Sequence, residues 1–326
     1  MWFLRLFLLI SLSIFICSDV SRALDCSAGT SKVAYTIIVD QSGHGNFTTV
    51  QGAIDSVPSH NAQWIQIQIN PGIYKEQVTI LKDKPCIFLK GYSAQTTKIV
   101  WDAHEQTDTS ATFTSYPDNI VAKRITFWNS YNRKMEGDNS TQALAARIYG
   151  DKSSFYGCGF IGLQDTLWDV KGRHYFELCY IEGAVDFIFG SGQSIYKKSS
   201  INVTASATGY ITAQSRGSLD DPSGFVFVGG SLYGTGQVYL GRAYGPYSRV
   251  IFDGIKLYNV VHPQGWDAWG FVGHEDNFTY AEANCRGPGA DTSRRVNWEK
   301  KLKRMEIAKF RNMSFIDKEG WLTKQP

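Results

Sequence analysis

The sequence predicts an all-β fold, a parallel β-helix with short flanking helices. The 326-residue chain is 14% aromatic and has 31 Gly but only 9 Pro and 4 Met, which favours strands and turns over a helical bundle. Short apolar runs with Gly or Asn at their bends recur every ~20–25 residues, and helical periodicity is largely absent. Each unit would form one turn of a coil stacked on the last. A β-sandwich or a propeller is the alternative.

The repeat is clearest in the middle of the chain. Residues 154–162 (SFYGCGFIG) resemble residues 175–183 (YFELCYIEG), so that Cys158 and Cys179 occupy the same place in two successive units. Weaker echoes follow around residues 225–227 and 250–252, and an earlier one lies at 125–127. The repeat therefore predicts stacked turns of similar length.

Both ends of the coil are expected to carry helices. Residues 296–310 place Trp298, Leu302, Met305 and Ile307 at near-helical spacing among Lys and Glu, which predicts an amphipathic helix packed over the coil. Residues 50–54 predict a short helix that caps the other end. No linker or low-complexity stretch is present, so residues 24–326 are predicted to form one domain.

The N-terminus predicts secretion. Residues 1–23 combine an early Arg5, an apolar stretch at 6–17 and a small-x-small site at residues 21–23, as in a secretory signal peptide. The apolar stretch is short for a membrane span, although an uncleaved anchor is the alternative. Secretion makes the N-glycosylation sequons meaningful and predicts a glycoprotein. Sequons begin at Asn46, Asn139, Asn202, Asn277 and Asn312.

The cysteines and charges exclude several functions. Cleavage would leave Cys26, Cys86, Cys158, Cys179 and Cys285, an odd number with at least one thiol unpaired. For Cys158 and Cys179 we favour stacked thiols over a bridge. The sequence contains no CxxC motif and no His/Cys cluster that would indicate a zinc site. The acidic residues at 220–221 are interpreted as part of a solvated loop. No metal or cofactor is therefore expected. The net charge is only +3, and the basic residues form no dense cluster of the kind that binds nucleic acid.

Two aspartates share the repeat spacing. Asp186 follows Asp165 by the same interval that separates the two cysteines, and Gln164 follows Gln142 by an interval one longer. If the period holds, the two carboxyl groups lie on neighbouring turns beside a row of amides. Two carboxylates so close cannot both ionise cheaply, so one would hold its proton and serve as an acid beside an anionic nucleophile or base. The alternative is two aspartates in solvated turns. The sequence contains no GxSxG motif, which argues against a serine esterase.

Several runs resemble the plant-type pectinesterases, which are pectin methylesterases. The matching pieces are GIYKE at 72–76, QALAAR at 142–147, GLQDTL at 162–167, VDFIFG at 185–190, LGR at 240–242 and GWDAW at 265–269. They occur in the family's order between about residues 37 and 321. The resemblance implies a right-handed parallel β-helix. Multi-domain members also carry an N-terminal inhibitor-like region, which is not expected here.

The resemblance also implies roles for individual residues. Asp186 matches the nucleophile, and Asp165 matches the acid that protonates methanol and then activates water. Gln164 and Gln142 match the amides that stabilise the developing oxyanion. Arg242 matches the guanidinium that keeps the nucleophile anionic and contacts the substrate. These roles suit the residue types, since an oriented carboxylate can act as a nucleophile and amide donors can stabilise an oxyanion.

Further residues are expected to contact the substrate. Thr112 matches a substrate contact of the family. Tyr244 stands where the family usually has Trp, but it keeps a flat face for a sugar ring. Trp269 is expected in the groove wall, whereas Trp266 could belong to the core. Arg147 is interpreted as a buried structural residue.

The sequence therefore predicts a secreted cell-wall enzyme that hydrolyses methyl esters of homogalacturonan without a cofactor. A monomer is expected, with a proteinaceous pectinesterase inhibitor as a further partner and no nucleic-acid or membrane partner. Two alternatives are kept open. One is a calcium-dependent pectate lyase on the same fold, and the other is a pectin-binding β-helix without catalysis.

Overall fold

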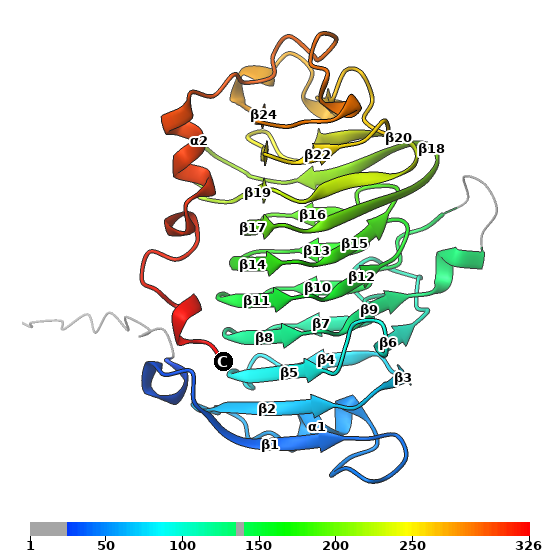
Figure 1. Ribbon diagram of the computed structural model, residues 1–326, viewed down its shortest axis with the longest axis vertical. Coiled ribbons are helices and arrows are strands. Elements are labelled where there is room, and N and C mark those ends of the chain that lie inside the picture. The colour runs from blue at the N-terminus through cyan, green and yellow to red at the C-terminus, as the bar shows by residue number, and fades with distance from the viewer. Residues whose placement is uncertain (1–24, 135–139) are drawn as a thin grey trace, which may run out of the picture.

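The structure, a computed structural model, describes residues 25–134 and 140–326 as a parallel β-helix (Figure 1). Successive strands wind around a common axis, and the strands of one turn pair in parallel with the equivalent strands of the next turn. The predicted signal peptide and the sequon at Asn139 lie outside the described residues. Within the described ranges, no helix combines the length and hydropathy that a membrane crossing requires.

One wall of the coil, called sheet A, contains ten strands within the described residues. In spatial order they are β1 (Val33–Val39), β2 (Trp64–Ile69), β5 (Ile87–Gly91), β8 (Ile120–Lys123), β11 (Ser153–Tyr156), β14 (Arg173–Glu177), β17 (Gln193–Lys197), β19 (Gly224–Val228), β21 (Arg249–Asp253) and β24 (Thr279–Ala283).

The other two walls form one continuous sheet, called sheet B, because two long strands bend from one wall to the other. These are β18 (Ser200–Gln214) and β20 (Ser231–Ala243). The wall before the bend contains β3 (Gly72–Lys75), β6 (Thr97–Trp101), β9 (Thr126–Asn129), β12 (Gly159–Ile161), β15 (Tyr180–Gly183) and β22 (Lys256–Leu257). The wall after it, called the B2 wall, contains β4 (Val78–Ile80), β7 (Phe113–Ser115), β10 (Ala146–Ile148), β13 (Leu167–Asp169), β16 (Ile188–Gly190) and β23 (Trp266–Asp267).

The predicted repeat corresponds to turns of the coil. Leu167 pairs with Ile188, and Gly159 pairs with Tyr180, so each residue faces its counterpart one repeat further along the chain. Inside sheet A, aromatic rings stack from turn to turn with centroids 4.5–5.0 Å apart. This ladder runs through Phe155, Phe176, Tyr196, Phe227 and Phe252. Such stacking suits parallel strands, because identical positions of neighbouring turns face one another.

The helices confirm one prediction and correct another. Helix α1 (Val50–Ser56) buries Val50, Ala53 and Ile54 at the N-terminal end of the coil, as expected. The C-terminal helix α2 covers only Arg304–Arg311, so the predicted start at residue 296 was wrong. Trp298 instead packs against aromatic rings at the C-terminal end of the coil. In the part of the chain that the structure describes, seven short 3-10 helices lie at Cys26–Gly29, Tyr131–Lys134, Trp269–Phe271, Glu275–Asn277, Pro288–Ala290, Met313–Phe315 and Leu322–Lys324.

The C-terminal segment runs back along the outside of sheet A (Figure 1). Its Ile316 and Trp321 pack on outward-facing residues of sheet A, including Tyr175 and Ile195. Further along, the Gln325 amide donates to the carbonyl of Lys152 at 2.7 Å. The apolar outer face of sheet A is therefore covered by the chain itself.

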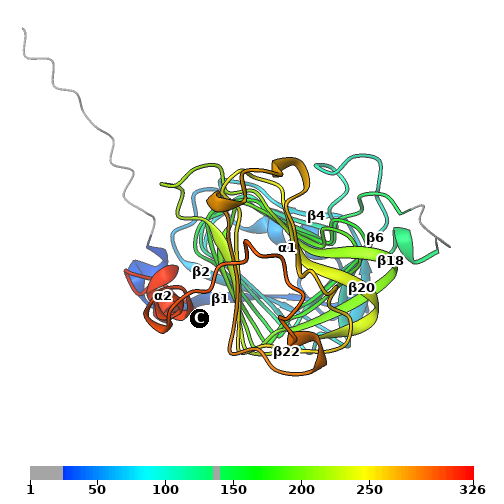
Figure 2. The same cartoon turned by 90° about the horizontal axis from the view of Figure 1, so that it is seen from above.

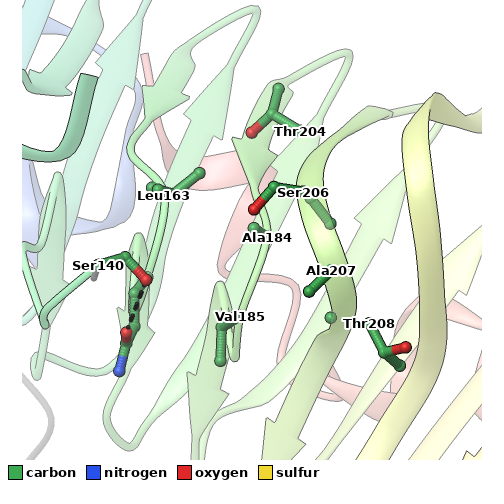
Figure 3. A pocket seen from close by; sticks show the side chains of 11 residues that line it. Ser140, Leu163, Ala184, Val185, Thr204, Ser206, Ala207 and Thr208 are labelled. Carbon is green, nitrogen blue, oxygen red and sulfur yellow. Dashed lines mark hydrogen bonds between the residues drawn. The ribbon is translucent and has the colours of Figure 1, made fainter. Parts of the chain in front are cut away.

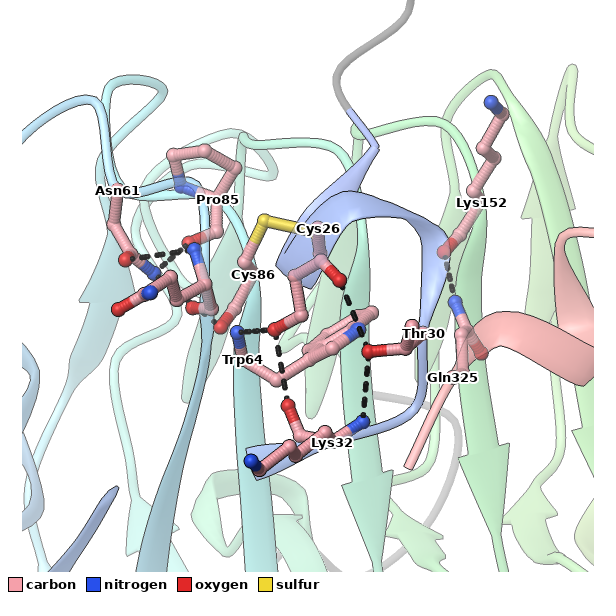
Figure 4. Close-up of a disulfide and its surroundings, with 11 residues drawn as sticks. Cys26, Thr30, Lys32, Asn61, Trp64, Pro85, Cys86, Lys152 and Gln325 are labelled. Atoms are coloured by element: carbon pink, nitrogen blue, oxygen red, sulfur yellow. Dashed lines mark hydrogen bonds between the residues drawn. A yellow bond between two sulfur atoms is a disulfide. The ribbon is translucent and has the colours of Figure 1, made fainter. Parts of the chain in front are cut away.

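The cysteines divide into a bridge and three thiols within the described residues. A disulfide joins Cys26 to Cys86 and ties the N-terminal segment to the coil (Figure 4). Cys158 and Cys179 are free and buried, as favoured from the sequence, and Cys285 is also free. The two buried thiols lie at equivalent positions of neighbouring turns, because the following residues, Gly159 and Tyr180, are paired.

Candidate active site

Asp165 and Asp186 lie in the turns that lead into β13 and β16. Gln164 forms a bridge with Val185, so the aspartates that follow them occupy equivalent positions on neighbouring turns, as the spacing predicted. Both have left-handed backbones, with φ of 60° and 47°. Non-glycine residues seldom adopt this conformation, and it clusters at functional sites.

Arg242 holds the carboxylate of Asp186. Its Nε donates to Asp186 Oδ1 at 2.8 Å, and its Nη2 donates to Oδ2. The two residues come together because β20 pairs with β18, which in turn pairs with β16. Burial raises the pKa of Asp186, and the hydrogen bonds and charge of Arg242 reduce that rise without cancelling it. A two-pronged Arg–carboxylate contact favours the ionised form and fixes its orientation.

Asp165 has a different environment. Burial and the neighbouring charge of Asp186 raise its pKa to about 7, against a smaller lowering by Arg242. Its carboxyl group has no hydrogen-bond partner within the described residues. Asp165 therefore holds its proton close to neutral pH, beside an aspartate that is paired with a cation.

The two amides lie next to the dyad. Gln142 is exposed and forms a bridge with Gln164, which is half-buried. The hydroxyl of Ser140 donates to Gln164 Oε1 at 3.2 Å (Figure 3). A hollow of about 260 Å³ opens beside Gln164. It is lined by Ser140, Leu163, Gln164, Ala184, Val185 and residues 204–209 of the bend in β18.

An aromatic wall stands beside Arg242. The rings of Tyr244 and Trp269 stack with centroids 5.4 Å apart, and the two side chains are 55% and 46% exposed. The two rings thus stack as expected, while their contact with a substrate stays a prediction. The guanidinium of Arg242 lies between Trp269 and Tyr210, at 4.3 Å and 4.4 Å from their ring centres. Trp266 is a core residue, with 1% of its surface exposed.

The remaining aromatic residues of this face were not predicted from the sequence. Trp168 and Phe189 stack at 5.2 Å on the outside of the B2 wall, and Arg242 continues the same row. Trp168 and Phe189 are separated by the same repeat length as the two aspartates, so the period could have revealed them. Tyr210 was harder to find, because β18 shifts register between Thr204 and Thr208.

Thr112 does not join the site. Its side chain is fully buried, and its hydroxyl donates to the carbonyl of Trp128 at 3.1 Å. A side chain in that position cannot reach a ligand, so we remove Thr112 from the substrate contacts. Arg147 is buried as expected, and donates to the carbonyl of Asp108 and the hydroxyl of Tyr149.

The site combines a carboxylate fixed by a guanidinium, a carboxyl that keeps its proton, and two amides. These groups can attack a carbonyl, stabilise a tetrahedral oxyanion and protonate a leaving alcohol. That set of steps is the cleavage of an ester. The aromatic wall and the row along the B2 wall offer flat surfaces for sugar rings.

Comparisons with known proteins agree with this chemistry. The Pectinesterase family model matches residues 36–319. The chain is 50% identical to probable pectinesterase 29 of Arabidopsis thaliana over 299 residues, which cover 89% of each chain. It is 49% identical to probable pectinesterase 55 of the same plant, covering 90% of this chain and 91% of the relative. The pectin methylesterase from carrot superposes with a TM-score of 0.84 at 30% identity, over 91% of this chain and 98% of that one. The chain therefore belongs to the pectinesterase family.

Proposed function

We propose that the chain hydrolyses the methyl esters of pectin with Asp186 as nucleophile and Asp165 as acid and base. Pectin methyl ester hydrolysis is the activity of its family. The observation that carries the assignment of roles is the contrast between the two aspartates. Arg242 binds the carboxylate of Asp186, whereas burial and that neighbour raise the pKa of Asp165.

The first half-reaction forms an acyl-enzyme. A carboxylate oxygen of Asp186 attacks the ester carbonyl, whose oxygen becomes anionic and accepts hydrogen bonds from the amides of Gln142 and Gln164. The bond from the carbonyl carbon to the methoxyl oxygen then breaks. Asp165 transfers its proton to that oxygen, and methanol leaves. A mixed anhydride now joins Asp186 to the sugar acid.

The second half-reaction uses water. The carboxylate of Asp165 accepts a proton from water, whose oxygen attacks the acyl carbonyl of the sugar acid. Collapse of the tetrahedral intermediate releases the Asp186 carboxylate and the free uronic acid, which loses its remaining proton to solvent and becomes a uronate. Asp165 is protonated again and ready for the next ester. Arg242 offsets the charge that returns to Asp186.

The finer assignments extend this proposal to the biology. The substrate is methylesterified homogalacturonan, and the enzyme is secreted to the cell wall as a monomer, after removal of residues 1–23. The exposed face around Tyr244 and Trp269 is also available to a proteinaceous inhibitor that would block the groove. These assignments rest on the sequence pattern and on the family.

Exchange of each aspartate tests the roles. Asp186→Ala removes the nucleophile, so methanol release from methylated pectin should fall to background. Asp165→Ala leaves the nucleophile and should lose about 10²–10⁴-fold, the usual contribution of general acid–base help. Asp220→Ala, at an exposed loop position, is the matched control and should match the wild type. Full inactivity of Asp165→Ala together with activity of Asp186→Ala would reverse the assignment.

The same assay separates the two alternative functions. A calcium-dependent lyase would lose activity with a chelator and would produce an unsaturated sugar without methanol. A binding protein without catalysis would release no methanol under any condition. We expect methanol release that is unchanged by a chelator.

A further inference from the structure

A second hollow lies on another side of the coil, between helix α2 and the ends of the last strands of sheet A. Its volume of about 830 Å³ lies within the range of ~300–1,000 Å³ usual for ligand sites. Arg304, Ile307 and Arg311 of α2 form one wall, and the turns after β19, β21 and β24 form the other. Seen along the coil axis, α2 lies across the coil from the bends of β18 and β20 (Figure 2).

The hollow carries a positive charge. The guanidinium of Arg304 has no hydrogen-bond or ion-pair partner within the described part of the chain. Arg311 Nη1 lies 3.6 Å from Asp253 Oδ2, beyond a good hydrogen bond, while Asp253 Oδ1 accepts from Asn284 at 2.7 Å. Two arginines thus line a hollow that contains one buried carboxylate, and most of their donors remain available.

Apolar groups complete the lining. Val228 and Ala283 contribute from the strand ends, and Leu302 and Ile307 contribute from the C-terminal segment. A pyranose ring has an apolar C–H face, and a uronate also has a carboxylate that suits a guanidinium fork. The hollow offers both kinds of surface side by side.

We propose that this hollow binds galacturonate residues of de-esterified pectin. The inference uses the carboxylate product of pectin methyl ester hydrolysis and therefore rests on that function. Lys303 and Lys309 are exposed on and beside the same helix and extend the positive surface for a longer polyanion. The enzyme would then stay attached to stretches that it has already demethylated while its cleft acts on esters nearby. Such an attachment weakens as salt screens the charges.

Titration calorimetry with trigalacturonate tests the site without turnover. Arg304→Gln with Arg311→Gln should raise the Kd at least about tenfold, equivalent to about 1.4 kcal/mol. Lys303→Gln with Lys309→Gln removes the same charge outside the hollow and should change the Kd much less. Arg242→Gln should keep this binding, because it alters only the catalytic cleft. Equal weakening by the two double variants, or none by the arginine pair, would overturn the proposal.

A variant that keeps both arginines tests the hollow itself. Ala308 lines it, so Ala308→Phe should fill the space and abolish trigalacturonate binding. Wild-type affinity in Ala308→Phe would show that the sugar does not enter the hollow. Initial methanol release from fully methylated pectin should stay unchanged in all hollow variants. Failure of the wild type to release methanol would refute the esterase function, whereas the binding result would stand by itself.

Discussion

Asp165 and Asp186 differ in their neighbours rather than in their backbones. Both are left-handed residues in equivalent turns, but only Asp186 receives the guanidinium of Arg242. One contact from a strand 56 residues later in the chain therefore separates a nucleophile from an acid. The period of the sequence could place the two aspartates together, but only the resemblance to a family could identify Arg242 as their partner.

The acid should set the alkaline limb of the activity. Asp165 must be protonated to release methanol, and burial beside Asp186 raises its pKa to about 7. We expect kcat/KM for a short methylated oligogalacturonide to fall as pH rises above about 7. Asp165→Ala, measured at its lower rate between about pH 5 and 9, should lack this limb. An unchanged alkaline limb in the variant would assign it to another group.

Tyr244 should contribute to substrate binding rather than to catalysis. It stacks on Trp269 and is half exposed, and an aromatic platform is worth on the order of 1 kcal/mol. Tyr244→Ala should therefore raise KM for pectin about fivefold with little change in kcat. Tyr244→Trp should bind at least as well as the wild type. Tyr92→Ala, at an exposed position away from the wall, is the control, and an effect as large in the control would remove the platform argument.

Sequence alone could not decide which residues of a matching run reach the groove. Thr112 stands one residue before β7, and its direction depends on how that turn enters the coil. In the structure, its hydroxyl donates a hydrogen bond to a backbone carbonyl of β9. Tyr210 was not predicted for a different reason. The register shift in β18 breaks the repeat that would have aligned this residue with the site.

At the scale of elements, the coil was predictable because each turn repeats the same short apolar runs. The C-terminal segment was less so. Trp298 and Leu302 have helical spacing, yet they pack on different clusters of the molecule, and helix α2 begins only after them. The bridge from Cys26 to Cys86 spans 60 residues and has no counterpart in the repeat, so no local pattern could reveal it.

The segment that covers sheet A should be important for stability. Trp321 is 3% exposed, packs on the outer face of the sheet and donates its indole N–H to the carbonyl of Ile316. Trp321→Ala should lower the free energy of unfolding by about 3–5 kcal/mol, because it leaves a cavity. Chemical denaturation measures this change. Met305→Ala, 75% exposed on α2, should change it little, and equal losses would argue against the covering role.

The stacked thiols should react only after unfolding. Cys158 and Cys179 are buried and free, and burial raises the pKa of Cys158 to about 12, so little reactive thiolate exists in the folded state. Titration with a thiol reagent in denaturant without reductant should find these two and Cys285. A count lower by two would indicate a bridge between Cys158 and Cys179. Cys285→Ser provides the control, since it should lower the count by one.

The buried His174 and the half-buried Asp151 make contributions to the stability of the whole molecule that change with pH in opposite directions. Burial lowers the pKa of His174, but Asp169 and the carbonyl of Gly150 outweigh it, so the net pKa is raised. Its contribution is full below about pH 6.5 and is lost as pH rises through the folded pKa. Burial raises the pKa of Asp151, but its bonds with Arg173 lower it overall. That contribution exists above about pH 4 and is lost in acid.

Asp165 adds to the loss of stability that accompanies a rise in pH. Its pKa rises from an ordinary value of 3.8 to about 7, so between these values the folded state binds a proton that the unfolded state has released. Stability should therefore fall as pH increases through this range, by up to about 1.4 kcal/mol per pH unit. The gain from Asp151 is complete above about pH 4, where the loss from Asp165 begins, so the maximum of Tm should lie near pH 4, with a further loss from His174 above about pH 6.5.

Asp165→Asn isolates this contribution, because the amide resembles the protonated acid and cannot ionise. Near pH 5, little more than one pH unit above the ordinary pKa of 3.8, the wild type has lost only a small part of this stability, so the Tm of the variant should be slightly higher. At pH 8 the wild type must hold a buried charge beside Asp186, and the variant should exceed its Tm by a larger margin. Thermal unfolding at both pH values measures the difference, with the exposed Asp220→Asn expected to follow the wild type throughout. A Tm difference between Asp165→Asn and the wild type that is the same at pH 5 and pH 8 would show that Asp165 does not carry its proton near neutral pH, and with it the acid in the proposed mechanism would be lost.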